Sequence, residues 1–257
     1  MPTPDPIDAG SIAVAVEHGV ATVSFSHPKG NSLPGALLGH LATTFDALAT
    51  SNDSQVIVLR SEGTGAFCGG ASFDELRSIR DAAQGLEFFS GFARVILAMR
   101  RNPKFILARV HGRAVGGGVG LVAAADYALA TENAQVRLSE LAVGIGPFVV
   151  GPVIEHKIGR GHFSALAADF DWRDAAWARQ AALYSRVKDS TIALDAVLDA
   201  LARKIARSNP DAMREMKRMF WRGTEAWDTL LFERAATSGR LILSNFAQEA
   251  LAALSRG

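Results

Sequence analysis

Hydrophobic residues at the start of the chain follow first the spacing of strands and then that of a helix. Residues 12–16 and 20–25 alternate between apolar and polar positions around the pair 18–19, as in a β-hairpin. Residues 37–49 carry apolar side chains at helical spacing, and residues 55–59 form a short apolar run typical of a buried strand. The sequence therefore predicts a hairpin, a helix and a further strand in this part of the chain.

The middle of the chain repeats the order strand, glycine-rich turn, helix. Residues 85–99 have the pattern of an amphipathic helix that ends at residues 102–103, because Pro103 cannot continue it. Residues 105–110 and 127–130 are predicted strands, and the small residues 119–125 between them are a predicted helix. The repeated order predicts βαβ units with right-handed crossovers, and hence an α/β fold.

Beyond residue 194 the pattern becomes almost wholly helical. In residues 221–243, aromatic and long aliphatic residues recur at helical spacing among charged ones. Such an apolar stripe suits a helix that faces the core and equally a contact between subunits. We therefore predict a core domain over residues 1–193 and a C-terminal helical region over residues 194–257.

Composition and charge narrow the classes of partner. The 257 residues are 49% hydrophobic, enough for one sizeable core, and the 27 basic and 26 acidic residues form no block of like charge that would track nucleic acid. No uninterrupted apolar stretch reaches the roughly 18 residues of a membrane span, and residues 1–6 lack the features of a signal peptide. The single cysteine, Cys68, fits a reducing compartment. These features predict a cytoplasmic protein that binds neither nucleic acid nor membrane.

Two glycine-rich turns, each between a predicted strand and a predicted helix, carry the strongest chemical signal. They span residues 63–74 and 111–120. Glycine lets the backbone approach a ligand closely, and the first N–H groups of the following helix then point at it. Two such turns suggest two N–H donors aimed at one oxygen atom. A dinucleotide-binding turn is disfavoured, because residues 116–120 do not supply the spacing G-x-G-x-x-G.

Four blocks, in the same order, resemble the crotonase superfamily of enoyl-CoA hydratases and isomerases. They are AFCGGASF at 66–73, VHGRAVGGG at 110–118, AADY at 124–127 and LSELAVGI at 138–145. Within that family, residues 70–76, 144–150 and 220–240 are most similar to bacterial methylglutaconyl-CoA hydratases. The resemblance implies a crotonase-type spiral of βαβ repeats with a C-terminal helical trimerisation region, assembled as a homotrimer or as a hexamer of two trimers.

The resemblance also implies an acyl-CoA substrate, with no metal and no cofactor besides the coenzyme A of that substrate. It assigns the two N–H donors to Ala71 and Gly117, which would stabilise the oxyanion of an enolate formed beside the thioester carbonyl. It assigns proton transfer to Glu140. Substrate contacts are implied for the glycines of the two turns and for several side chains near them: Lys29, Gly69, Ser72, Phe73, Gly116, Gly120 and Phe148.

One position departs from the two-carboxylate hydratases of this family. Their first glutamate falls on Gly120, which cannot transfer a proton, whereas their second is Glu140. Hydration needs a water that attacks the β-carbon and a proton delivered to the α-carbon, whereas moving a double bond from 3-enoyl to 2-enoyl needs one base. We predict a hydratase for a short or branched 2-enoyl-CoA of the methylglutaconyl type. A 3-enoyl-CoA isomerase and a non-catalytic acyl-CoA binding protein are the alternatives.

A second carboxylate could restore the two-group arrangement if the fold brought it into the site. The candidates are Glu62, Asp74, Glu75 and Glu87. An apolar pocket lined by Leu141, Phe148 and Val149 would raise the pKa of Glu140. The alternative to a catalytic role for Glu140 is a structural one, in which its carboxylate follows a Ser139 cap at the N-terminus of a helix and is stabilised by the helix dipole.

Other side chains carry expectations about packing. The acyl group could be shaped by a set of phenylalanines: Phe88, Phe89, Phe92, Phe148 and Phe163. Cys68 is predicted to pack rather than to react, and Asp126 to hold the turn after its helix by local hydrogen bonds.

Overall fold

The computed structural model describes residues 10–254, so residues 1–6, for which no signal peptide is predicted, lie outside the described residues. The described chain contains a six-stranded sheet with the order β1-β2-β3-β4-β6-β8, and a two-stranded sheet of β5 and β7. The strands are β1 (Ser11–Glu17), β2 (Val20–Ser26), β3 (Val56–Ser61), β4 (Phe105–Val110), β5 (Ala114–Val115), β6 (Tyr127–Thr131), β7 (Val136–Arg137) and β8 (Arg186–Lys188).

The predicted βαβ architecture is confirmed. β1 and β2 form the antiparallel hairpin, and each later neighbour in the large sheet pairs in parallel, so helices must connect them. The helices are α1 (Gly35–Thr50), α2 (Phe73–Ser78), α3 (Ala82–Arg101), α4 (Gly117–Ala124), the 3₁₀ turn η1 (Leu141–Val143), α5 (Gly151–Asp169), α6 (Ala175–Gln180), α7 (Thr191–Ala206), α8 (Pro210–Phe220), α9 (Trp227–Leu241) and α10 (Asn245–Leu254). The helix predicted at 119–125 begins two residues earlier, at Gly117 inside the glycine run.

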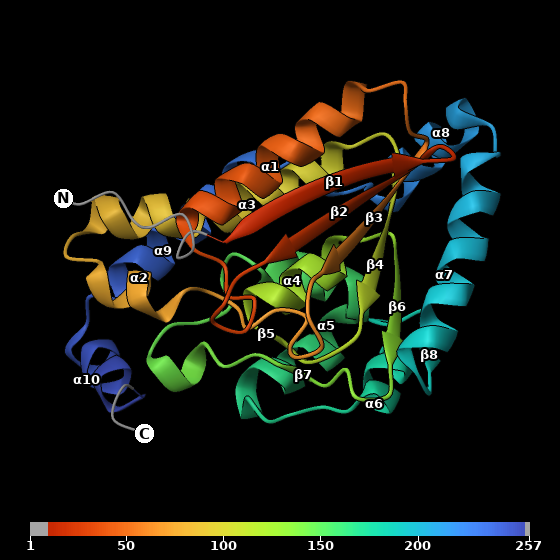
Figure 1. The fold of residues 1–257 in the computed structure, drawn as a ribbon. Helices are drawn as coiled ribbons and strands as arrows, with labels where there is room; N and C mark the ends of the chain where they lie inside the picture. The colour runs from red at the N-terminus through yellow and green to blue at the C-terminus, as the bar shows by residue number, and fades with distance from the viewer. Residues whose placement is uncertain (1–9, 255–257) are drawn as a thin grey trace.

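The large sheet has apolar side chains on both faces. Ile57 and Leu59 of β3 belong to the main core beside α1 and α3, whereas Val56 and Val58 belong to a smaller cluster under α7. Figure 1 shows α7 running along the sheet on the opposite side from α1 and α3. A strand buried on both faces reads as a continuous apolar run, which explains the pattern of residues 55–59.

The C-terminal helices pack on the core of the same chain. α7 begins at Thr191, close to the predicted boundary at 194, α9 packs along α3, and α10 lies beside η1 and α2. Residues 221–243 supply Trp221, Trp227 and Leu231 to the main core, so the core-facing interpretation of this stripe is confirmed for them.

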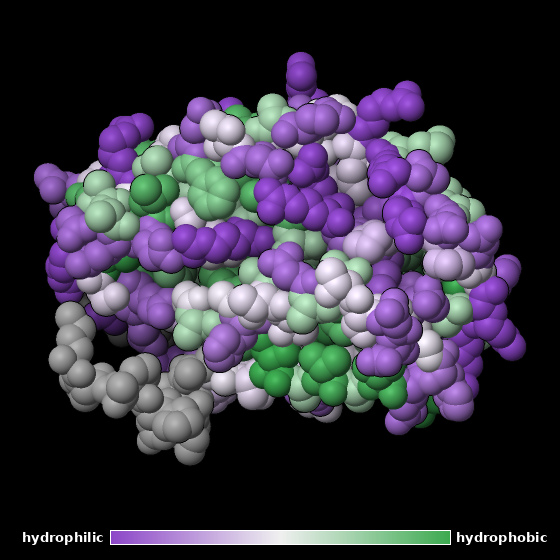
Figure 2. All heavy atoms as spheres, turned by 90° about the horizontal axis from the view of Figure 1, so that it is seen from above, coloured by the Kyte–Doolittle hydropathy of each residue, from purple (hydrophilic) through white to green (hydrophobic). Residues whose placement is uncertain are grey.

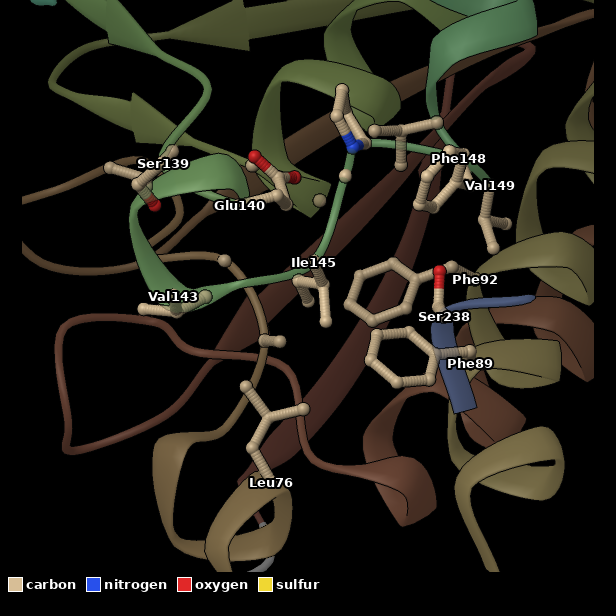
Figure 3. Close-up of a pocket in the computed structure, with 18 of the residues that line it drawn as sticks. Leu76, Phe89, Phe92, Ser139, Glu140, Val143, Ile145, Phe148, Val149 and Ser238 are labelled. Carbon is tan, nitrogen blue, oxygen red and sulfur yellow. The ribbon is translucent and has the colours of Figure 1, made fainter. Parts of the chain in front are cut away.

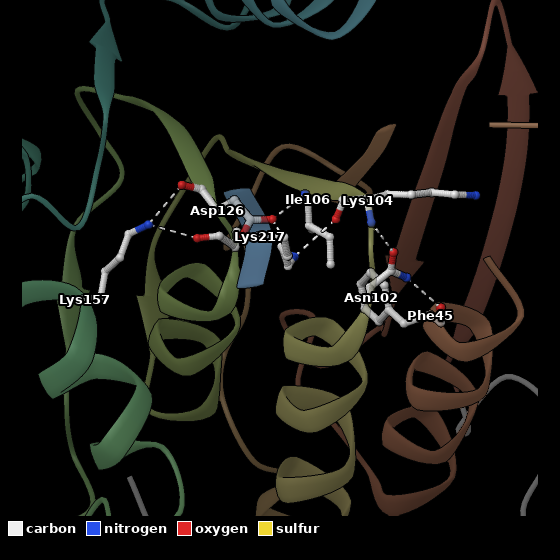
Figure 4. A network of polar contacts seen from close by, with 8 residues as sticks. Phe45, Asn102, Lys104, Ile106, Asp126, Lys157 and Lys217 are labelled. Carbon is white, nitrogen blue, oxygen red and sulfur yellow. Dashed lines mark hydrogen bonds and ion pairs between the residues drawn. The ribbon is translucent and has the colours of Figure 1, made fainter. Parts of the chain in front are cut away.

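A buried ion pair ties α8 to the sheet (Figure 4). Lys217 of α8 lies 2.6 Å from Asp126 Oδ2, and both side chains are 4% exposed. The same oxygen accepts the Ile106 N–H of β4 at 2.7 Å, while the Lys157 ammonium donates to the main-chain oxygens of Ala125 and Asp126 at 2.9 and 3.3 Å. Asp126 is therefore structural, as predicted, but its partners come from distant segments rather than from the local turn.

Hydrophilic side chains dominate the face seen from above, and hydrophobic ones gather there in a few patches (Figure 2). Among residues 10–254, no helix is both long enough and apolar enough to cross a lipid bilayer.

Candidate active site

The two glycine turns are joined side by side by main-chain hydrogen bonds. The Cys68 N–H donates to Arg113 O at 3.1 Å, and the Val115 N–H donates to Cys68 O at 2.9 Å. Gly70 has φ +87°, and a Cβ atom there would lie 2.9 Å from Val115 O and 3.9 Å from the Gly117 nitrogen. Only glycine fits this contact, so Gly70 brings the first turn against the start of α4.

The predicted N–H donors of Ala71 and Gly117 line one cavity between these turns. Neither N–H donates a hydrogen bond to another group of residues 10–254, whereas the neighbouring Ser72 and Gly116 N–H groups donate to Leu33 O and Arg137 O at 3.2 and 2.9 Å. The Gly117 N–H opens α4, where the helix dipole favours negative charge. The two groups are thus available to an oxygen atom in the cavity.

Glu140 lies three residues after the end of β7 and contacts the second glycine turn at Gly116. A Cβ atom on Gly116, which has φ +51°, would lie 2.8 Å from Glu140 Oε1, and the other carboxylate oxygen is buried without a hydrogen-bond partner in the described chain. Burial raises the pKa of Glu140 to about 7, and main-chain hydrogen bonds from Glu140 and Ser139 offset part of this effect. The alternative for Glu140 is met in position only: Glu140 directly precedes the three-residue 3₁₀ turn η1, but neither its side chain nor that of Ser139 makes a cap hydrogen bond there.

The cavity is apolar apart from a few groups (Figure 3). Its lining consists of Gly69, Gly70, Ala71, Phe73, Leu76, Phe89, Phe92, Val115, Gly116, Gly117, Ser139, Glu140, Val143, Ile145, Gly146, Pro147, Phe148, Val149, Val150 and Ser238. Within this lining Glu140 is the one ionisable side chain. The cavity measures about 60 Å³, room for a few water molecules at 10–15 Å³ or more each.

Three of the predicted substrate contacts lie outside the lining. Lys29 forms an ion pair with Asp74 at the surface, and Ser72 Oγ accepts the Glu75 N–H at 3.4 Å as the cap of α2. Gly120 lies behind Val150. The remaining predicted contacts belong to the lining: Gly69, Phe73, Gly116 and Phe148.

Val150 occupies the space next to Gly120. A Cβ atom on Gly120 would lie 2.6 Å from Val150 Cγ1 and 2.9 Å from Val150 Cβ, so a glutamate there would have to displace this side chain. Where the hydratases that the chain resembles carry their first glutamate, this protein therefore presents an apolar valine to the cavity.

Within residues 10–254, no other carboxylate takes the place of the missing one. The four candidates, Glu62, Asp74, Glu75 and Glu87, are all absent from the cavity lining. Glu62, Asp74 and Glu87 form ion pairs with Arg60, Lys29 and Arg94, respectively. Glu75 accepts a hydrogen bond from the Gly35 N–H. The described chain thus contributes a single carboxylate to this cavity.

Part of the predicted set of phenylalanines lines the cavity. Phe89 and Phe92 line the cavity, whereas Phe88 and Phe163 do not, and Leu141 is 48% exposed. Ser238 of α9 was missed, because the C-terminal helices were assigned to the core or to a subunit contact and not to the site. A signal was present in the adjacent glycine, since glycine inside a helix indicates close packing.

Cys68 has the packing role that was predicted for it. The thiol is fully buried, and burial raises its pKa to about 12, so it carries no thiolate near neutral pH. A Cβ atom on Gly118 would lie 2.6 Å from Cys68 Cβ, which places the cysteine in contact with the first turn of α4.

The chain is similar in sequence and in structure to known proteins. The model of the enoyl-CoA hydratase/isomerase family matches residues 15–250. Rat mitochondrial methylglutaconyl-CoA hydratase is 32% identical over 80% of this chain and 67% of that protein. The chain spans about half the length of the Bacillus subtilis protein named "Probable enoyl-CoA hydratase", with 30% identity over 55% of this chain and 54% of that protein. The crystal structure of an enoyl-CoA hydratase from Bacillus halodurans superposes with a TM-score of 0.87 at 18% identity, covering 94% of this chain and 99% of that one.

Proposed function

The chain belongs to the enoyl-CoA hydratase/isomerase family, and we propose that it is an acyl-CoA enzyme that isomerises a 3-enoyl thioester to the 2-enoyl thioester. One observation carries this proposal: Glu140 is the one ionisable side chain in a cavity that also holds the N–H groups of Ala71 and Gly117. A double-bond shift needs one group that removes a proton and returns it, together with donors for the enolate oxygen.

The proposed reaction begins with the thioester oxygen accepting hydrogen bonds from the Ala71 and Gly117 N–H groups. The Glu140 carboxylate removes a proton from the α-carbon, and the electron pair of that C–H bond moves into a dienolate whose negative charge lies on the held oxygen. Glu140, now protonated, returns the proton to the γ-carbon. The double bond moves from the β,γ to the α,β position, and the carboxylate is regenerated. In other enzymes the loss of one such donor costs about 3 kcal/mol of barrier.

The electrostatics of Glu140 support this role. Burial raises its pKa to about 7, which makes the carboxylate a stronger base while leaving it substantially ionised near neutral pH. A group that must both accept and return a proton works best when its pKa lies near the working pH.

Hydration is the second candidate, and the relatives favour it, since methylglutaconyl-CoA hydratase is the name of the rat protein at 32% identity. With one carboxylate, the attacking water would also have to supply the α-proton while Glu140 exchanges protons with it. A methylglutaconyl group carries a free carboxylate, and the cavity lining contains no cationic side chain to pair with it. We therefore favour an uncharged acyl group for either reaction.

Assembly as a trimer or hexamer and a cytoplasmic location stay predictions. Apolar side chains of the C-terminal helices supply surface for such assembly, since Met219, Phe220 and Phe246 are exposed.

Mass spectrometry and the ultraviolet absorbance of the conjugated thioester test the proposal with 3-hexenoyl-CoA and crotonyl-CoA. An isomerase converts the first substrate at constant mass with a gain in conjugation, and Glu140→Gln abolishes this while Glu87→Gln, which removes an exposed carboxylate of α3, does not. A gain of one water with crotonyl-CoA and no isomerisation would instead establish the hydratase. Binding without conversion of either ester would overturn both.

A further inference from the structure

Ser238 of α9 places a hydroxyl group in the apolar part of the cavity, beside Phe89 and Phe92. The residue is 1% exposed and belongs to the cavity lining. In Figure 3 its side chain extends from α9 among the side chains that line the cavity, beside Phe92. Within residues 10–254 its oxygen forms no side-chain hydrogen bond, not even to the helix carbonyl one turn earlier, unlike the neighbouring Thr237, which donates to Glu233 O at 3.1 Å.

A close contact between two helices holds this hydroxyl in position. A Cβ atom on Gly85 of α3 would lie 2.6 Å from Gly239 Cα, and one on Gly239 would lie 2.7 Å from the Gly85 carbonyl carbon. Gly85, Phe89 and Phe92 share one face of α3 by their spacing. The glycine contact therefore brings Ser238 level with the two phenylalanines, and any larger residue at either glycine would push α9 away.

The surroundings of the hydroxyl restrict what it can bind. The side chains near it in the lining are apolar, so the hydroxyl reaches the cavity without a polar side chain beside it, and a group that occupies the cavity there has to supply its hydrogen bond. A carboxylate at this place would find no Lys, Arg or His in the lining and would share the cavity with Glu140. The matching chemistry is an uncharged group that forms hydrogen bonds, such as a hydroxyl or a ketone.

We infer that Ser238 is a specificity-determining residue, and that the acyl group of the substrate carries an uncharged hydrogen-bonding substituent that reaches it. This inference rests on the proposed binding of acyl-CoA thioesters, but not on which reaction follows. Ser238 belongs to α9 and lies beside Phe89 and Phe92, apart from Glu140 (Figure 3), so it is not assigned proton transfer.

Binding of saturated acyl-CoA esters separates this inference from the reaction. Dissociation constants are measured by calorimetry for hexanoyl-CoA, for its 4-, 5- and 6-hydroxy derivatives, and for adipoyl-CoA, which ends in a carboxylate. We expect the wild-type protein to bind at least one hydroxy derivative more tightly than hexanoyl-CoA, and adipoyl-CoA most weakly. In Ser238→Ala the preference for that hydroxy derivative falls roughly five- to tenfold, while hexanoyl-CoA binds as before.

Thr237→Ala is the matched control, because it removes a hydroxyl from the adjacent position of the same helix, and it is expected to leave all the constants unchanged. A preference that is absent in the wild type, or that survives in Ser238→Ala, overturns the inference and leaves the proposed function standing. Adipoyl-CoA as the tightest ligand overturns the assignment to uncharged groups. Failure of every ester to bind overturns the proposed function and the inference together.

Discussion

Replacing Glu140 with glutamine removes a carboxyl group that the fold holds away from its ordinary pKa. Because burial raises that pKa from 4.5 to about 7, the folded protein binds the proton more strongly than the unfolded chain does. The contribution of this group to stability is therefore fully present below pH 4.5 and is lost as the pH rises to about 7. Glutamine has no charge to desolvate, so the substitution stabilises the protein above this range and has little effect below it.

The magnitude follows from the two pKa values. At about 1.36 kcal/mol per pH unit, the raised pKa costs up to about 3 kcal/mol of folding free energy above pH 7. Glu140 retains some solvent exposure, so we expect Glu140→Gln to increase the free energy of unfolding by about 1–3 kcal/mol at pH 8. The assay is urea unfolding of wild type and variant, followed by circular dichroism at equal protein concentration, at about pH 4.5 and about pH 8.

Glu87→Gln is a control for which the opposite dependence of stability on pH is expected. A hydrogen bond to Arg94 lowers the pKa of Glu87, so its contribution to stability is present at neutral pH and is lost on acidification. Its removal is expected to leave neutral-pH stability equal or slightly lower, since exposed ion pairs contribute little. An equal effect of Glu140→Gln at both pH values, or a loss of stability at pH 8, would refute the burial argument for Glu140.

Three further predictions concern the same residues and the buried ion pair. Initial rates should show kcat/KM rising with pH and levelling off above about 7, because Glu140 must be ionised to accept the proton; a flat profile from pH 5.5 to 8.5 would contradict its role as base. Gly120→Glu alone should lower the melting temperature through its clash with Val150, and Gly120→Glu combined with Val150→Ala should recover stability and increase water addition to crotonyl-CoA; equal melting temperatures for the two variants would contradict the clash. Lys217→Met should cost about 3–5 kcal/mol in urea unfolding, because it leaves the Asp126 carboxylate buried without its cation; a change below 1 kcal/mol would mean that the pair is not buried in solution.

Much of the fold could be predicted because its signals are local. The β1–β2 hairpin and the run 55–59 follow from the spacing of apolar residues, and the helix before Asn102 ends where Pro103 requires. The two glycine turns were recognisable for the same reason, since positions such as Gly70 need a backbone conformation that other residues rarely adopt.

The candidate site was only partly predictable. The position of Glu140 followed from the family resemblance, and an apolar pocket around it was expected. Only two of the three residues predicted to line that pocket do so. Leu141 points to solvent, while Phe148 and Val149 line the cavity. The side chains of a 3₁₀ turn and of the loop after it do not alternate in a regular way. The sequence pattern therefore could not predict which of these residues face the cavity.

By itself, the sequence determined the order of the main strands and helices up to residue 130 and the places of the two glycine turns. Each of these depends on the conformational preferences of residues within one short segment. Only the tertiary structure decided that Val150 fills the space at Gly120, and that Ser238 reaches the same cavity as Glu140. These facts depend on distances between segments that are far apart in the chain. The packing of α4 against α5 sets the first, and the close contact of α3 with α9 sets the second.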